Sequence, residues 1–165
     1  MQVTIRDATE DDLPAMLEIY NDAVLNTTAV WTIHTADLEN RRALMRERKA
    51  KGYPVLVATL GDMLLGYASF GDFRPWDGYG HTVEHSIYVH QHHHGKGVGK
   101  AMMPPLIAAA RALGKHVMVA GVDAANTSSL QFHQRFGFVE AGRMREVGWK
   151  FDRWLDLVLL QKMLD

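Results

Sequence analysis

The chain has 165 residues, 47% of them hydrophobic and 22% charged, and its formal net charge is −1 at pH 7. This size and composition predict one soluble domain over residues 1–165, and the charge gives no reason to expect nucleic acid or an anionic membrane as partner. The absence of cysteine excludes disulfides, thiolate zinc sites and an acyl-enzyme on cysteine.

The N-terminal third of the chain reads as one strand and two helices. Residues 3–6 alternate between apolar and polar side chains, which predicts a first strand. Residues 9–12 can cap a helix, and the apolar stripe that follows them ends at residues 26–28. A second, highly charged helix is predicted over residues 35–51. Between the two helices lies Trp31, which is either a core residue or a wall of a substrate site.

A strand pair and an aromatic loop follow. Residues 55–60 and 63–70 read as strands joined at Gly61-Asp62, which is a strong hairpin signal. The loop at residues 72–80 is rich in aromatic side chains and contains one arginine, Arg74. Loops of this kind on a rigid sheet commonly carry ligand contacts.

The chain is organised around residues 83–100, where a strand leads through a histidine-rich turn into alternate glycines. On the strand, Glu84, Ser86 and Tyr88 share one face. The glycines precede a helix predicted over residues 101–113, in which Pro104-Pro105 predicts a kink or a shifted start. A strand, a glycine loop and a helix start can hold phosphate, because the first backbone N–H groups of a helix are unpaired. The glycine spacing fits neither the P-loop nor the dinucleotide-binding fingerprint.

The remaining segments complete an α/β pattern. Residues 116–122 read as a buried strand and residues 130–136 as a short helix, followed by strands at residues 138–143 and 154–161. The order β-α-α-β-β-β-α-β-α-β-β predicts an α/β domain with a mixed, mainly antiparallel sheet.

Two motifs resemble the GNAT acetyltransferases. Gly97-Val98-Gly99 is similar to the core of their pyrophosphate loop, Gln/Arg-x-x-Gly-x-Gly/Ala, with His94 at the leading position. The segment at residues 126–138 resembles a GNAT segment of the form Asn-x-x-Ser…Gly-Phe, whose Asn and Ser contact the pantetheine arm. The second motif follows the first by about 30 residues with a strand between, and the pair is far less expected by chance than either motif alone.

A third stretch narrows the resemblance to one branch. Residues 145–156, together with Thr82-Val83-Glu84 and His133, look like the phosphinothricin acetyltransferases. Members of that branch acetylate the α-amine of phosphinothricin, methionine sulfoximine or methionine sulfone. The resemblance implies a GNAT fold with helices flanking the sheet, acetyl-CoA as co-substrate with no metal, direct transfer in a ternary complex, and a homodimer.

Several residues are candidates for the individual steps of an acetyl transfer. An acceptor amine with a pKa of roughly 8 must lose a proton before it can attack. Glu84 is the candidate base, a role that the resemblance also implies; the alternative is a solvated strand carboxylate. The backbone N–H groups near Tyr88 and Val89 are candidate oxyanion donors if the strand splays there. The resemblance implies that His133 serves the leaving thiolate; otherwise it is a surface or core histidine. Arg74 is either the partner of an acceptor carboxylate or a plain surface arginine.

These expectations define two residue sets. The predicted cofactor-binding residues are Ile87, Tyr88, Val89, His94, Gly95, Lys96, Gly97, Val98, Gly99, Lys100, Asn126 and Ser129. The predicted substrate-binding residues are Trp31, Arg74, Pro75, Trp76, Tyr79, Glu84, His85, Ser86 and Leu157.

Other functions are also open. A polyamine or a protein N-terminus is an alternative acceptor for an acetyltransferase. A non-catalytic acyl-CoA sensor or a metal-binding module is an alternative without enzymatic activity. The histidines at residues 90–94 point in several directions and have no clustered carboxylate or thiol, so we expect no metal site. No apolar run approaches the roughly 18 residues of a membrane span, so we expect a cytoplasmic protein that acts on a small amine.

Overall fold

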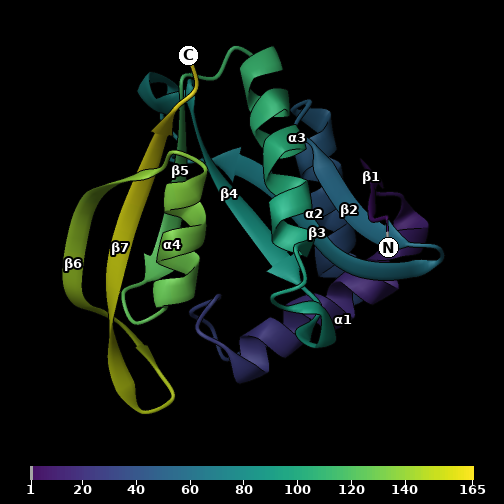
Figure 1. The fold of residues 1–165 in the computed structure, drawn as a ribbon, viewed down its shortest axis with the longest axis horizontal. Helices are drawn as coiled ribbons and strands as arrows, with labels where there is room; N and C mark the ends of the chain where they lie inside the picture. The colour runs from purple at the N-terminus through teal and green to yellow at the C-terminus, as the bar shows by residue number, and fades with distance from the viewer. Residues whose placement is uncertain (1) are drawn as a thin grey trace.

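The computed structural model describes residues 2–165 and contains one seven-stranded sheet with helices on both of its faces (Figure 1). Its elements are β1 (Thr4–Asp7), α1 (Leu13–Asn26), α2 (Leu38–Ala50), β2 (Val55–Leu60), β3 (Met63–Asp72), β4 (Thr82–Val89), α3 (Val98–Ala112), β5 (Val117–Asp123), α4 (Thr127–Arg135), β6 (Val139–Lys150) and β7 (Arg153–Met163), with short 3₁₀ helices at Glu10–Asp12, Asp77–Tyr79 and Gln91–His93. The strand order is β1-β2-β3-β4-β5-β7-β6, and only the β4–β5 pair is parallel among the described strands. The predicted mixed, mostly antiparallel α/β architecture is therefore confirmed.

Alternation along β4 gives its two faces different neighbours. Val83 is fully buried in the core that α3 forms with the sheet, and Ile87 and Val89 pack against the same core. Tyr88 points the other way and packs against the core that α1 and α2 form on the opposite face. The predicted period-two pattern of this strand is confirmed.

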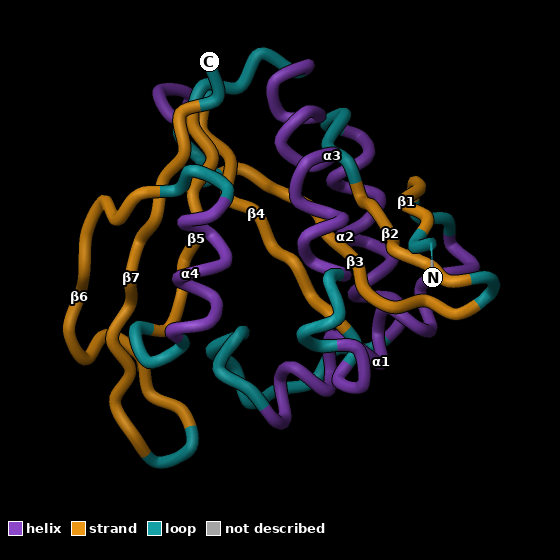
Figure 2. The backbone as a smooth tube through the Cα atoms, viewed as in Figure 1, coloured by secondary structure: helices purple, strands orange, loops and turns teal. Residues whose placement is uncertain are grey.

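The sheet opens between its two central strands. The parallel pairing of β4 with β5 covers only Thr82, Val83 and Glu84, opposite residues 117–119. Each strand continues to pair with its outer neighbour, β4 with β3 as far as Val89 and β5 with β7 to its end. The two strands therefore diverge beyond Glu84, and Figures 1 and 2 show the resulting gap.

Both later helices begin earlier than the sequence predicts. α3 begins at Val98, directly after Gly97 in a left-handed conformation with φ 83°, and it runs without a break through Pro104-Pro105. α4 begins at Thr127, because the side chain of Asn126 caps it by accepting a hydrogen bond from the N–H of Ser129.

The predicted hairpin turn at Gly61-Asp62 is confirmed. A second hairpin, formed by β6 and β7, is longer than predicted. The turn of the long hairpin consists of Phe151 and Asp152, with φ 53° and 57°. Two-residue turns with both φ values positive favour Asn-Gly or Asp-Gly. The Phe-Asp pair carries no such signal, so the predicted strands stopped short of this turn.

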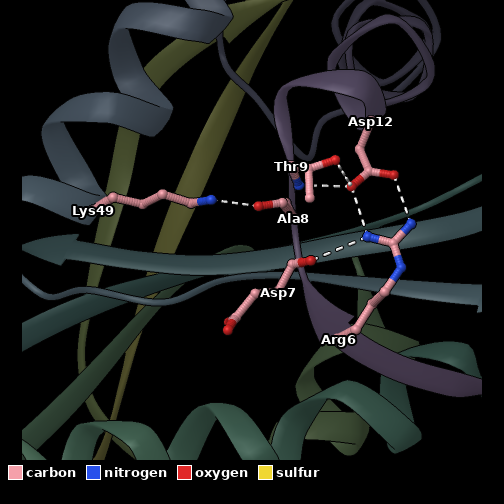
Figure 3. Close-up of polar contacts among 6 residues, drawn as sticks. All are labelled: Arg6, Asp7, Ala8, Thr9, Asp12 and Lys49. Carbon is pink, nitrogen blue, oxygen red and sulfur yellow. Dashed lines mark hydrogen bonds and ion pairs between the residues drawn. The ribbon is translucent and has the colours of Figure 1, made fainter.

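A polar junction attaches α2 to the start of the chain (Figure 3). The guanidinium of Arg6 donates to both carboxylate oxygens of Asp12 at 2.7 and 2.8 Å, and the N–H of Thr9 donates to the same carboxylate. From α2, the ammonium of Lys49 donates to the carbonyl of Ala8. The bond from Lys49 attaches α2 to the segment that follows β1, and the contacts of Asp12 with Arg6 and Thr9 fix the conformation of that segment.

Candidate active site

The gap between β4 and β5 exposes backbone donors of β4. The N–H of His90 donates to the carbonyl of Leu65 at 2.8 Å, which identifies the even-numbered residues as those that bond β3. Backbone N–H groups of residues two apart point to the same edge of a strand, so the N–H of Tyr88 also points to β3. The N–H groups of Ile87 and Val89 point into the gap. Of the two predicted oxyanion donors, Val89 therefore faces the gap and Tyr88 does not.

The glycine loop lies where β4 leads into α3. Gly95 and Gly97 have φ values of 72° and 83°, which side chains rarely adopt, and no described atom lies within 4 Å of a Cβ built at either position. The loop thus leaves space next to the first turn of α3, whose N–H groups at Val98, Gly99 and Lys100 have no partner within the helix. Lys100 is exposed, as is the neighbouring Lys96 of the loop. This arrangement suits an anion such as a pyrophosphate.

His94 attaches the glycine loop to β4. Its Nε2 lies 2.7 Å from the carbonyl oxygen of Val89, and because a carbonyl can only accept, this nitrogen carries the hydrogen. The imidazole therefore donates to the end of the strand instead of projecting over the loop. A histidine at the leading position of the motif holds the loop in place through the backbone.

His85 and His133 form a buried pair on the α4 side of the sheet. Their Nε2 atoms are 3.0 Å apart, and the Nδ1 of His133 lies 2.7 Å from the carbonyl of Ser129. That nitrogen must donate, so in a neutral His133 the Nε2 is an acceptor and the Nε2–H of His85 donates to it. The Nδ1 of His85 then carries a lone pair, and it has no partner among the described residues.

Burial keeps both imidazoles neutral near pH 7. Burial, together with the neighbouring His133, lowers the pKa of His85 to about 3, and burial lowers the pKa of His133 despite its hydrogen bond to Ser129. His133 has no N–H left for a thiolate in this state, and His85 lies on the face of β4 opposite Ser86. The predicted roles of the two histidines stay predictions.

Glu84 stands where the two strands begin to diverge. Its partly exposed side chain lies on the same face of β4 as Ser86 and Tyr88. Burial raises the pKa of the Glu84 carboxyl, and the positive charges of Arg74 and Arg48 oppose that rise. Arg74, in the exposed loop after β3, is therefore close enough to influence this carboxyl.

A cavity of about 220 Å³ extends from the Ser86 and Tyr88 face of β4 to the inner faces of α1 and α2. Two arginines of α2, Arg41 and Arg48, line it, and sequence reasoning missed both. The signal was their spacing: residues 41, 44, 45 and 48 form one helical face, on which a core-facing helix normally carries only apolar side chains.

The other predicted substrate residues lie in three places. Pro75, Trp76 and Tyr79 are exposed on the aromatic loop. Leu157 is partly buried on β7, where it pairs with the end of β5. Trp31 lines a second cavity, of about 490 Å³, which lies against the β6–β7 hairpin.

Trp31 is held by two contacts that the sequence did not reveal. Gly148 lies so close that a Cβ built there would be 2.3 Å from the indole Cε3. Lys150 of the same hairpin is 1% exposed and donates to the carbonyls of Thr27 and Val30, each at 2.6 Å. Burial lowers the pKa of Lys150. The hairpin thus fixes the loop between α1 and α2 on which Trp31 lies.

Asn126 and Ser129 both lie in the first turn of α4. The Oδ1 of Asn126 accepts from the N–H of Ser129 at 3.1 Å and from the hydroxyl of Ser128 at 3.0 Å. Among residues 2–165, no three His, Cys, Asp or Glu side chains form a group that could hold a metal ion. Within the same range no helix is long and apolar enough to cross a membrane.

Comparisons with known proteins agree with this geometry. The family model described as Acetyltransferase (GNAT) family matches residues 14–138. The L-methionine sulfoximine/L-methionine sulfone acetyltransferase of Salmonella typhimurium is 50% identical, over 99% of this chain and 95% of that protein. The phosphinothricin N-acetyltransferase of Alcaligenes faecalis is 39% identical, over 98% of this chain and 83% of that protein.

A solved structure extends the likeness to three dimensions. A putative acetyltransferase from Salmonella typhimurium, solved with its cofactor acetyl-CoA, superposes with a TM-score of 0.97 at 50% identity, covering 99% of this chain and 94% of that one. The fold and the resemblance predicted from the motifs are therefore confirmed. The chain belongs to the GNAT family of acetyltransferases.

Proposed function

We propose that this protein transfers the acetyl group of acetyl-CoA directly to the α-amine of a small amino-acid analogue: methionine sulfone, methionine sulfoximine or phosphinothricin. The observation that carries the proposal is Glu84, a carboxylate of raised pKa at the point where β4 and β5 begin to diverge; the glycine loop follows the other end of β4. The acceptors are supported by the names of relatives that match nearly the whole chain.

The donor site is supported by the loop and the gap. The first N–H groups of α3, with Lys96 and Lys100 beside them, suit the pyrophosphate of a CoA. From there a pantetheine arm can run through the gap toward Asn126 and Ser129 at the start of α4. A thioester carbonyl near the free N–H of Val89 would be polarised by that donor.

The transfer needs two proton movements. The carboxylate of Glu84 takes one proton from the acceptor ammonium, and the neutral nitrogen attacks the thioester carbon. The N–H of Val89 stabilises the oxyanion that forms. When the C–S bond breaks, the second proton leaves the nitrogen and reaches the thiolate sulfur, giving an amide and free CoA. His133 is proposed to relay that second proton: once its bond to His85 opens, the lone pair of its Nε2 can accept the proton from the nitrogen and pass it to the thiolate sulfur.

Two further expectations belong to this proposal. The long hairpin of β6 and β7 exposes Met144, Trp149 and Trp154, each by about half of its surface or more, and β6 is an edge strand. This apolar surface supports the expected homodimer. Acetylation of a toxic amino-acid analogue would be a detoxification, carried out in the cytoplasm.

Free-thiol release from acetyl-CoA tests the proposal with a panel of acceptors. The panel contains methionine sulfoximine, methionine sulfone, phosphinothricin, a polyamine and a short peptide. We expect turnover with the first three alone. Turnover only with the peptide or the polyamine would refute the acceptor assignment. Tight acetyl-CoA binding without any turnover would refute the enzyme and favour a sensor.

A further inference from the structure

The cavity under β4 combines an apolar wall with polar groups that lack partners. Its apolar side includes Met16 and Met45, from α1 and α2. On its polar side, the hydroxyl of Tyr67 is buried and meets hydrogen-bond geometry with no described residue, although the guanidinium of Arg41 lies near it. A buried hydroxyl without a partner is costly, and such groups in native proteins usually indicate a role.

Arg48 adds unused donors to the same cavity. Its guanidinium has five N–H groups, and among residues 2–165 it makes one side-chain hydrogen bond, to the hydroxyl of Ser69 at 3.2 Å. It lies directly over Gly71, where an added Cβ would be 3.1 Å from the guanidinium carbon. Gly71 is the register partner of Glu84, so this guanidinium sits beside the proposed base.

Arg41 brings a second positive charge. It lies about two helical turns before Arg48, on the same face of α2. Its guanidinium stacks over the ring of Tyr20 at 4.0 Å, and it bonds Asn40 at the rim of the helix. A planar cation held by stacking presents its remaining N–H groups in a fixed direction. The cavity therefore offers two guanidinium groups and a hydroxyl to a ligand, next to a surface that suits methyl and methylene groups.

The position of this cavity relative to Glu84 determines which part of an amino acid the cavity can bind. The α-carboxylate is bonded to the same carbon as the reacting amine, so it must stay near Glu84, where Arg74 also acts. Ser86, which lines the cavity, lies two residues further along β4, roughly 6.6 Å away. An amino acid with its amine at Glu84 can therefore extend its side chain into the cavity.

We propose that this cavity binds the oxidised side-chain terminus of the acceptor, with Arg48 and Arg41 holding the oxygen atoms of its sulfone, sulfoximine or phosphinate group. Tyr67 donates to the same oxygens, and Met16 and Met45 enclose the methyl group and the methylene chain. This inference rests on the proposed function and makes it more specific. Methionine has the same chain without these oxygens, so it would leave the cavity-facing N–H groups of two partly buried guanidiniums, and a buried hydroxyl, without acceptors.

The test compares kcat/KM for methionine sulfone with kcat/KM for methionine. In the wild-type protein the sulfone is expected to be the better acceptor. Arg48→Met should reduce the sulfone-to-methionine preference by about 10- to 100-fold, which corresponds to the loss of hydrogen bonds to a charged group. Arg46→Met is the matched control, because Arg46 lies on the outer face of α2 and pairs with Glu10. The control should leave the preference unchanged.

A second variant tests geometry without removing charge. Gly71→Ala places a methyl group against the guanidinium of Arg48 and should reduce the preference in the same direction, by less. It also serves if Arg48→Met does not fold. An equal loss of kcat/KM for both acceptors in the variant that folds would overturn the proposal.

Equilibrium binding separates this inference from the proposed function. Calorimetric titration of methionine sulfone into the CoA-bound protein should show binding that Arg48→Met weakens by about tenfold or more. If the wild-type protein acetylates no amino-acid analogue, the proposed function fails. Arg48-dependent binding of the sulfone would still support the cavity assignment, and absence of binding would overturn it.

Discussion

Replacement of Glu84 by Gln removes the proposed base and keeps the size of the side chain. At pH 7 an amine with a pKa of roughly 8 is about one tenth neutral, so the variant must rely on that minor form. Positioned general bases contribute about 10²- to 10⁴-fold. We expect kcat/KM at pH 7 to fall at least about 100-fold, or about 2.7 kcal/mol in activation free energy.

The pH profile distinguishes a base from a residue that only supports the fold. In the wild-type enzyme the active carboxylate form is lost as the pH falls through the raised pKa of Glu84, so the profile is flat between that value and the pKa of the acceptor ammonium, whose proton Glu84 takes. In Glu84→Gln, kcat/KM should rise about tenfold per pH unit until the amine itself is neutral.

Thiol release between pH 6 and pH 9 measures both profiles, and calorimetry with acetyl-CoA checks that the donor site is intact. Glu47→Gln is the control, because Glu47 is an exposed carboxylate of α2 that pairs with Lys51. Full turnover by Glu84→Gln across this range, with acetyl-CoA affinity retained, would refute the mechanism.

Three other substitutions have defined outcomes. Gly148→Ala should lower the free energy of unfolding in urea by about 1–3 kcal/mol, because its Cβ would overlap Trp31, whereas Gly142→Ala has open space and should cost less; equal losses would contradict the packing. His94→Ala should raise KM for acetyl-CoA about fivefold with kcat unchanged, since the glycine loop loses its bond to β4; an unchanged KM would contradict that role. The pKa of His85 is about 3 in the folded protein, against an ordinary value of 6.5. Below about pH 6.5 the unfolded chain therefore binds one proton more than the folded chain at this site. The free energy of unfolding should decrease there by up to about 1.4 kcal/mol for each unit by which the pH is lowered. His85→Phe should reduce that slope in urea unfolding between pH 7 and pH 5, and an unchanged slope would contradict it.

Local patterns in the sequence predicted the parts of the site that lie on a single segment. The alternation of β4 placed Glu84 and Tyr88 on one face, and the glycines at 95 and 97 indicated a loop that leads into a helix, although that helix begins at Val98 instead of residue 101. These features depend on neighbours in the chain, such as the pleat of a strand and the unpaired N–H groups of a first helical turn. Such signals can be read without knowledge of the tertiary structure.

The cavity under β4 could not be predicted in the same way. Arg41 and Arg48 appear in the sequence as part of a highly charged helix, and charged helices usually face solvent. Which face of α2 turns inward is decided by distant contacts, including the bond from Lys49 to the carbonyl of Ala8. The pairing of His85 with His133 likewise joins residues 48 positions apart.

The short contact between β4 and β5 divides the sheet into two mechanical units. Strands β1–β4 and β5–β7 are each paired along their length, and three register pairs at one end, with the core around α3, join them. In native-state hydrogen exchange the amides of Ile87 and Val89, which have no strand partner on their open side, should exchange readily in the free protein. A pantetheine arm in the gap would protect them and link the two units. Through that linkage the co-substrate would raise the melting temperature of the protein as its concentration rises.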